Sequence, residues 1–396
     1  LEESLKEGKV TEEQINAACR RVLEAKYKLG LFSDPYKYCD TLRTREKLYT
    51  AEHRSSARTI ATETFVLLKN DHRLLPLDIK GKIALIGPMA DARNNMCGMW
   101  SMTCTPSRHG TLLEGIRSAV GDKAEILYAK GSNIYYDAET EKAAMGIRPL
   151  ERGDNRQLLD EALRIAARAD VIVAALGECA EMSGESVSRT SLEIPDAQQD
   201  LLKALVKTGK PVILLLFTGR PLVLNWEATN VHSILNVWFG GSETGDAVAD
   251  VLFGRVSPSG KLTTTFPRSV GQLPLFYNHL NTGRPDPDNR IFNRYASNYL
   301  DESNGSLYPF GYDSYEIGQL YLRDIYAEIA RPVKELKGFE RIFLKSGESR
   351  DIKFIITEND LRFYNSGLEY IYEPGEFDVM VGPNSCDVQA KRFKVE

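Results

Sequence analysis

Three glutamates, Glu178, Glu181 and Glu185, lie in a loop-like stretch, residues 176–195 (LGECAEMSGESVSRTSLEIP), and are the strongest candidates for chemistry in this chain. Carboxyl groups can transfer protons when they are positioned beside a reacting bond. The stretch is about twenty residues long, and loops of that length are more often functional or disordered than plain connections. A solvated surface loop whose glutamates have no role is the alternative, and the loop alone leaves both interpretations open.

The elements around this loop indicate where it lies. Residues 170–176 (DVIVAAL) form an apolar run of strand length, and helical patterns precede it at 158–169 and follow it at 197–207. A strand between two helices is typical of a parallel sheet, and open α/β folds bind ligands at the carboxyl ends of such strands. The three glutamates are therefore predicted at the edge of a sheet where sites usually form.

Composition excludes several classes of function. The chain has 396 residues with 42% hydrophobic and 27% charged residues, which is typical of a globular protein of two or three domains. No apolar run approaches the 18 or more residues of a membrane span, so none is predicted. A net charge of −5 without a basic stripe argues against a nucleic-acid partner.

Six cysteines lack C-x-x-C spacing and paired histidines, so no metal site is predicted. Cys97 and Cys104 could form a disulfide in an oxidising compartment, and the sequence leaves that pairing open.

The first 50 residues are predicted to be a helix and a linker. Residues 11–14 (TEEQ) form a capping box, and a helical pattern follows until Gly30. The chain starts at Leu1 without a signal-peptide core, so we expect it to be a fragment whose N-terminus lies upstream. Ile15, Val22 and Leu23 on the apolar face of the helix should be covered by the rest of the chain or by another chain.

Residues 51–267 are predicted to form an α/β sandwich with a mostly parallel sheet, because strand and helix patterns alternate. The predicted strands are residues 65–68, 83–86, 125–128, 171–176, 212–217 and 234–237, and the predicted helices are 53–63, 111–120, 158–169, 197–207 and 243–252.

Residues 268–312 are rich in Asn, Pro, Gly and Tyr and are predicted to be an extended connector. The last part, 313–396, is predicted to be an antiparallel β-sandwich of fibronectin type III-like class. Its predicted strands are residues 317–322, 333–336, 340–344, 350–356, 368–372, 376–381 and 388–395. Its length falls short of the roughly 100 residues of a complete domain of this class, so we expect an incomplete one.

Seven short motifs occur along the chain in an order that resembles glycoside hydrolase family 3, of the bacterial periplasmic β-glucosidase kind. They are KYKLGLFSDPY (26–36), FVLLKN (65–70), IALIGP (83–88), PSGKL (258–262), TFPR (265–268), YPFGY (308–312) and RPVKELKGF (331–339). The resemblance implies an N-terminal (β/α)8 barrel before the α/β sandwich, and a fibronectin-like domain after it. Only the last barrel helix has a counterpart here. The family's nucleophile is a barrel aspartate, so none is assigned in this chain.

The resemblance further implies a retaining glycosidase whose acid/base residue lies on a loop of the sandwich domain. Such an enzyme needs two carboxyl groups about 5–5.5 Å apart. Glu185 is the first candidate because Gly184 and Ser186 flank it, and Glu181 is the second. Glu178 is expected to be structural because it lies against the strand end.

Two further residues are candidates for substrate binding. Arg189 could contact sugar, although an ion pair that holds the loop is the stronger interpretation. Trp100 could line the mouth of the pocket as an aromatic platform, with ordinary packing as the alternative.

The implied partners are an oligosaccharide or β-glucoside substrate and the missing barrel, with a homodimer as a further expectation. No cofactor and no catalytic metal are expected, and the location is expected to be periplasmic or secreted. A non-catalytic carbohydrate-binding or interaction module is the competing class.

Overall fold

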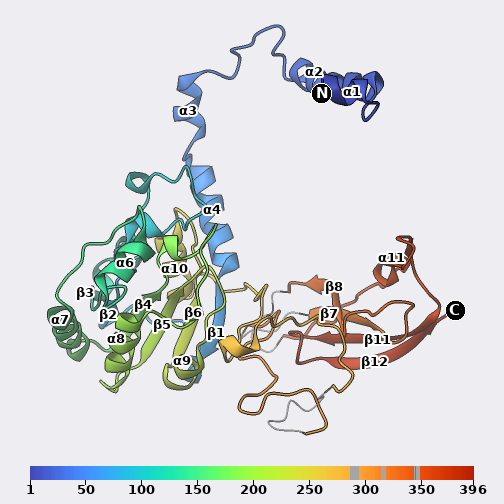
Figure 1. Cartoon of the computed structure of the whole chain (residues 1–396). Coiled ribbons are helices and arrows are strands. Elements are labelled where there is room, and N and C mark those ends of the chain that lie inside the picture. The colour runs from blue at the N-terminus through green and yellow to red at the C-terminus, as the bar shows by residue number, and fades with distance from the viewer. Residues whose placement is uncertain (286–293, 314–317, 343, 345–347) are drawn as a thin grey trace. The chain divides into compact units, whose positions relative to one another are not determined.

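The computed structural model describes residues 1–285, 294–313, 318–342, 344 and 348–396, and the chain forms two compact units, Leu1–Ser56 and Ala57–Glu396 (Figure 1). The first unit contains helices α1 (Glu2–Lys6), α2 (Glu12–Lys28) and α3 (Thr41–Lys47). Helix α4 (Ala51–Thr64) begins in the first unit and continues into the second.

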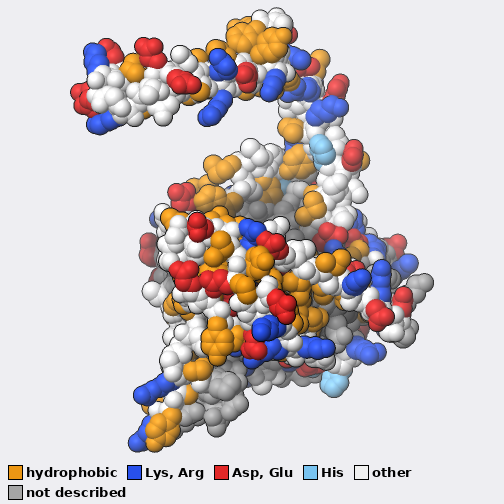
Figure 2. Space-filling view, turned by 90° about the vertical axis from the view of Figure 1, so that its right-hand side faces the viewer, with side chains coloured by type: hydrophobic (Ala, Val, Ile, Leu, Met, Phe, Trp, Pro, Cys, Tyr) orange, Lys and Arg blue, Asp and Glu red, His pale blue; other side chains and the backbone are white. Residues whose placement is uncertain are grey.

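The capping box that begins α2 is confirmed. The Thr11 hydroxyl accepts a hydrogen bond from the Gln14 amide at 3.2 Å, and the Gln14 side chain accepts one from the Thr11 amide at 2.9 Å. Along the apolar face of α2, Ile15 is partly buried, whereas Val22 and Leu23 are 56% and 45% exposed. Figure 2 shows hydrophobic side chains at the surface of this N-terminal helical segment. Their burial against another chain stays a prediction.

The second unit is built around a six-stranded sheet in the order β1-β6-β5-β4-β2-β3. Neighbouring strands are parallel except β1 and β6, which are antiparallel, so the predicted, mostly parallel sheet is confirmed. The strands lie within two residues of their predicted ends: β1 (Val66–Asn70), β2 (Lys82–Ile86), β3 (Glu125–Ala129), β4 (Val171–Gly177), β5 (Val212–Phe217) and β6 (Ser233–Asn236).

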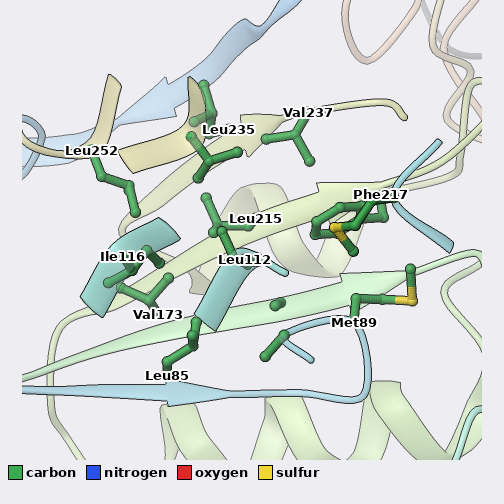
Figure 3. Close-up of a cluster of buried hydrophobic side chains, with 14 of the residues drawn as sticks. Leu85, Met89, Leu112, Ile116, Val173, Leu215, Phe217, Leu235, Val237 and Leu252 are labelled. Carbon is green, nitrogen blue, oxygen red and sulfur yellow. The ribbon is translucent and has the colours of Figure 1, made fainter. Parts of the chain in front are cut away.

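Helices cover both faces of this sheet, which explains why its central strands are apolar on both sides. In β5, Ile213, Leu215 and Phe217 enter one core, and the alternate residues Val212, Leu214 and Leu216 enter the other. Helices α5 (Leu112–Val120) and α10 (Thr244–Leu252) pack over the first core, part of which is drawn in Figure 3. Helices α7 (Asn155–Arg168) and α8 (Asp196–Val206) pack over the second.

Two short helices of this domain were not predicted, α6 (Ala138–Met145) and α9 (Asn225–Asn230). Each buries only one or two side chains, so neither shows the apolar repeat of a helix that packs along its length. Short 3₁₀ turns connect the larger elements: η1 (Asp71–Arg73), η2 (Arg93–Asn95), η3 (Pro106–Arg108), η4 (Gly121–Lys123), η5 (Ala180–Met182) and η6 (Val270–Gln272).

The C-terminal part contains a four-stranded antiparallel sheet in the order β12-β11-β7-β8 and a separate pair, β9 with β10. The antiparallel class is confirmed. The elements are β7 (Gly318–Asp324), β8 (Glu335–Glu340), α11 (Glu358–Leu361), β9 (Phe363–Tyr364), β10 (Tyr370–Ile371), β11 (Gly375–Gly382) and β12 (Gln389–Val395). One strand, β8, replaces the two predicted at 333–336 and 340–344; residues 317 and 343 of the predicted strands lie outside the described part.

The strand predicted at residues 350–356 is wrong, because that segment forms no strand. Its alternating apolar side chains instead pack where the neighbouring sheet has no side chains of its own. Ile352 lies against Gly318, and Phe354 lies against Gly338. Alternating apolar residues therefore indicate that one face of a segment is packed, but they do not establish that its backbone pairs with a strand.

Residues 268–285 and 294–312 of the predicted connector contain only η6 as a regular element, and residues 286–293 lie outside the described part. Single bridges join Phe266 to Tyr308 and Leu280 to Pro332. Asp313, the first residue after the connector, forms an ion pair of 2.7 Å with Lys261.

Helix α9 contains a buried glutamate, Glu227, which is 1% exposed and whose Oε1 atom has no hydrogen-bond partner among the described residues. Burial raises the pKa of Glu227, the charge of Glu193 raises it further, and Lys203 opposes the shift. A raised pKa in the folded state means that ionising this group destabilises the fold. Stability should therefore fall as the pH rises from the unfolded-state pKa, about 4.3, to the folded-state pKa.

We expect Glu227→Gln to have a higher free energy of unfolding than the parent at pH 7. The difference in free energy between the two proteins should become smaller towards pH 4.5. The neutral amide has the shape of the protonated acid and loses the penalty of ionisation. Urea unfolding followed by tryptophan fluorescence at several pH values measures the effect. Glu161→Gln on the exposed side of α7 is the matched control, and an unchanged pH dependence in Glu227→Gln would contradict the interpretation.

Candidate functional site

The candidate loop begins where β4 ends, at the carboxyl edge of the parallel sheet. Gly177 closes the strand with φ 130°, and a β-carbon at this position would lie 2.0 Å from the carbonyl oxygen of Phe217 on β5. Only glycine fits this close approach without displacing backbone. The approach brings the start of the loop against the residues that follow β5.

Glu178, the next residue, is completely buried and is the centre of an ionic network. Its carboxylate lies 2.8 Å from Arg189 and 3.1 Å from Arg220, and both side chains are largely buried. It also accepts hydrogen bonds from the Thr218 hydroxyl at 2.9 Å and the Gly219 amide at 3.1 Å. The structural role expected for Glu178 fits these contacts, since a buried carboxylate requires such compensation.

Arg220 extends the network to the tip of the loop. Besides its ion pair with Glu178, its Nη2 donates to the carbonyl oxygens of Met182 and Val187, the latter at 3.4 Å. These two carbonyls flank residues 183–186. A single guanidinium therefore holds both ends of the segment that carries Glu185.

Glu185 itself is exposed at this tip, and none of the described residues donates a hydrogen bond to its carboxylate or forms an ion pair with it. The backbone around it is sharply turned, with φ of 129° at Gly184 and 60° at Ser186. The tip thus presents an unpaired carboxyl group on a segment anchored at its base. This arrangement suits a group that acts on a partner placed against the loop.

Glu181 has a different environment. It lies in η5, its side chain is only 11% exposed, and its carboxylate is 3.1 Å from Nε of Arg148. Arg148 also donates to the carbonyl of Gly98, and the Ala180 amide donates to Asn95 at 2.8 Å. Because its carboxylate is engaged and covered, Glu181 is the weaker of the two acid/base candidates.

Trp100 is brought beside the tip of the loop. It is 72% exposed and lies in a short segment closed by a disulfide between Cys97 and Cys104. A β-carbon at Gly184 would lie 2.6 Å from Met99 and 3.7 Å from Nε1 of Trp100, so the two segments touch there. Trp100 therefore lies beside Gly184, the residue before Glu185, although the two are far apart in sequence.

Arg189 makes contacts that hold the loop. Besides pairing with Glu178, it donates to the Tyr135 hydroxyl at 3.3 Å and to the carbonyl of Glu193 at 2.9 Å. Burial raises the pKa of Tyr135, so this hydroxyl stays protonated. Arg189 lines one wall of a pocket of about 380 Å³ whose lining includes neither Glu185 nor Trp100. A contact between Arg189 and sugar stays a prediction.

Cys179 follows Glu178 but is not a candidate nucleophile. It is buried, its thiol lies 3.2 Å from the carbonyl oxygen of Ala144, and burial raises its pKa to about 12. A thiol of that kind remains protonated and unreactive at neutral pH.

The sequence interpretation placed neither of two arginines that organise the site beside the candidate loop: the run 219–221 was interpreted as an inter-domain contact at a strand end, and Arg148 was not singled out. Arg220 belongs to the run Gly219-Arg-Pro221 directly after β5, and its place beside the end of β4 was a usable signal, because adjacent parallel strands end at the same edge. Arg148 gave no comparable signal, since it follows a short, unpredicted helix in irregular chain. The described residues also bring Cys97, Cys104 and His109 together as a group with metal-ligand chemistry, which the cysteine spacing had not indicated.

Comparison with known proteins gives consistent matches. Residues 65–314 match the glycosyl hydrolase family 3 C-terminal domain, and residues 316–385 match a fibronectin type III-like domain. The chain is 42% identical to a periplasmic β-glucosidase of Salmonella typhimurium, over 99% of this chain and 57% of that protein. It is 34% identical to a β-xylosidase of Formosa agariphila, over 94% of this chain and 54% of that protein.

A crystal structure of a β-glucosidase from Listeria innocua in complex with isofagomine superposes with a TM-score of 0.84 and 35% sequence identity. The match covers all of this chain and 57% of that one. The chain thus spans somewhat more than half the length of these proteins.

The network around Glu178 generates a prediction about stability. Glu178→Gln removes the charge that compensates Arg189 and Arg220, and breaking a buried ion pair in this way costs about 3 kcal/mol. We expect a lower unfolding midpoint and faster proteolytic cleavage within residues 182–190. Glu161→Gln, an exposed glutamate on α7, is the control and should change neither. Equal behaviour of the two variants would show that the network does not hold the loop.

Proposed function

This chain belongs to glycosyl hydrolase family 3, whose C-terminal domain it carries, and we propose that it forms part of a retaining β-glycosidase in which Glu185 is the acid/base. The observation that carries the proposal is the unpaired, exposed Glu185 carboxylate on a segment anchored by Arg220. The partner nucleophile, by family resemblance, is an aspartate of a barrel outside these 396 residues.

The proposed chemistry needs Glu185 in two protonation states. As an acid it protonates the departing glycosidic oxygen while the nucleophile attacks the anomeric carbon. As a base it then removes a proton from the water that hydrolyses the glycosyl-enzyme. A nearby anionic nucleophile favours the protonated form of Glu185, and the nucleophile loses that charge once it is glycosylated.

The remaining residues take supporting roles in this proposal. Arg220 and Glu178 hold the tip in place, since acid–base catalysis requires the carboxyl group within hydrogen-bond distance of the glycosidic oxygen. Trp100, exposed beside the tip, offers an aromatic face to the sugar or aglycone on the leaving-group side. Arg189 supports the loop from its inner side.

The proposed substrates are oligosaccharides or β-glucosides with a terminal non-reducing β-linked sugar. Relatives named β-glucosidase and β-xylosidase are compatible with either sugar. Two-carboxylate hydrolysis requires no cofactor and no metal ion. A homodimer remains an expectation of ours.

We propose a periplasmic or secreted location. The Salmonella relative is named periplasmic, and the Cys97–Cys104 disulfide suits an oxidising compartment. Among the helices of the described chain, none combines the length and the apolar character of a membrane span.

The test is leaving-group dependence in the full-length enzyme. Glu185→Ala should lower kcat/KM for alkyl glucosides by about 10²–10⁴-fold, the usual contribution of a general acid. Aryl glucosides with activated leaving groups should be affected far less, because they depart with little protonation. Azide should restore turnover and yield a β-glycosyl azide, since a small anion can replace the missing base.

Two variants serve as comparisons for this test. Glu193→Ala, in the same loop, should retain parent kinetics. If Glu181→Ala shows both effects and Glu185→Ala shows neither, the role belongs to Glu181. If the full-length protein binds β-glucans and hydrolyses no β-glycoside, the non-catalytic binding module is the correct class.

A further inference from the structure

We propose that Cys97, Cys104 and His109 form a second site on this chain, which binds Zn²⁺ when the two cysteines are reduced and is closed by their disulfide when they are oxidised. The three residues come from one loop between η2 and α5. Their potential ligand atoms all lie within 4.8 Å of one another. The metal has no part in the proposed hydrolysis, and Glu185 is not one of its ligands.

The spacing of the ligand atoms fits tetrahedral zinc. Zn–S and Zn–N distances of about 2.3 and 2.1 Å imply about 3.6 Å between a thiolate and an imidazole bound to one ion. The Cys97 sulfur lies 3.7 Å from Nε2 of His109. One pair of ligands is thus already at the separation that a shared ion requires, and reduction frees the Cys104 sulfur to join them.

The histidine is oriented as a metal ligand would be. His109 is only 4% exposed, and its Nδ1 lies 3.1 Å from the carbonyl oxygen of Gly110. A carbonyl can only accept, so the proton is on Nδ1 and the lone pair of Nε2 points towards Cys97. Metal-bound histidines are commonly fixed by this kind of bond from the other ring nitrogen. The backbone carbonyl of His109 is held in turn by the guanidinium of Arg93.

The two cysteines are less buried than the histidine. Cys97 and Cys104 are half-buried, whereas the histidine behind them is buried. Three protein ligands leave the fourth tetrahedral position for water or another small ligand, as in zinc sites that are not purely structural. If His109 only fills space beside the disulfide, reduction should produce no zinc binding.

The site changes between its two states by thiol–disulfide exchange. A dithiol reductant supplies two electrons and two protons, the Cys97–Cys104 bond breaks, and the reductant becomes a disulfide. Binding of Zn²⁺ then displaces one proton from each thiol, since only thiolates ligate the ion. In the reverse direction a disulfide oxidant accepts two electrons from the two thiolates and, with two protons from solvent, becomes a dithiol, while the Cys97–Cys104 bond forms again and Zn²⁺ is released.

Either state of this site constrains the segment beside the candidate catalytic loop. Met99 and Trp100 lie between the two cysteines and contact Gly184, the residue before Glu185. A covalent bond or a bound ion holds the two ends of this segment together, whereas free thiols leave them untied. Trp100 is highly exposed, so its fluorescence reports on the segment.

The test is zinc binding by the full chain with Cys19, Cys39 and Cys386, the exposed free cysteines, changed to Ser. The reduced protein, freed of reductant without air, is titrated with ZnCl₂ against a chromophoric chelator. We expect one Zn²⁺ per chain, bound at least about 100-fold more tightly than by the oxidised protein. Co²⁺ in place of Zn²⁺ should give thiolate charge-transfer absorption and the d–d bands of a tetrahedral ion.

Cys97→Ser, Cys104→Ser and His109→Ala should each weaken zinc binding by at least about 10-fold. His53→Ala, an exposed histidine on α4, is the matched control and should bind as the parent does. A second measurement needs no variant: Zn²⁺ should protect Cys97 and Cys104 of the reduced parent from iodoacetamide, as read by peptide mass spectrometry. Equal binding by oxidised and reduced protein, full affinity in His109→Ala, or no protection of the two cysteines would overturn the proposal.

Discussion

The candidate site depends on a single buried carboxylate. Glu178 has no exposed surface, and the two guanidinium groups beside it must stay in place because a buried charge without compensation is far costlier than a paired one. Arg189 ties the returning half of the loop to this carboxylate, and Arg220 ties the tip to it through two backbone carbonyls. The unpaired glutamate at the tip is exposed because a paired glutamate seven residues earlier fixes the chain.

This network exists only because two parallel strands end side by side. Gly177 on β4 is in register with Phe217 on β5, so Glu178 and Thr218 follow the two strands at the same edge. The apolar cores on both faces of the sheet hold those strands in place, and the strand ends in turn fix the position of the residues that anchor the loop. A site partly made of loop can therefore be precise, provided its anchoring residues lie at strand ends.

Most of the α/β domain could be predicted from sequence, because strands buried on both faces are apolar throughout and their helices are long and amphipathic. The short helices α6 and α9 could not be predicted, since each buries too few side chains to produce a helical repeat of apolar residues in the sequence. In the site, proximity to a strand end identified the loop and its three candidate glutamates. The ion-pair partner of Glu181 and the neighbour of the loop tip depend on tertiary placement: Arg148 comes from irregular chain, and Trp100, which lies beside Gly184, comes from a loop some eighty residues earlier. Residues 350–356 mislead for the opposite reason, because a strand-like period arises there from packing alone.

The pairing of β1 with β6 has a consequence for how the chain is made. Val66 pairs with Asn236, about 170 residues later, and this contact completes one edge of the sheet. During synthesis β1 emerges before the other strands of this sheet. It cannot pair until β6 has been made, so its apolar residues stay uncovered until then. The four strands in between can associate earlier, in parallel and through their own helices. The domain is thus expected to assemble from its middle outwards, with its first strand as the last to dock.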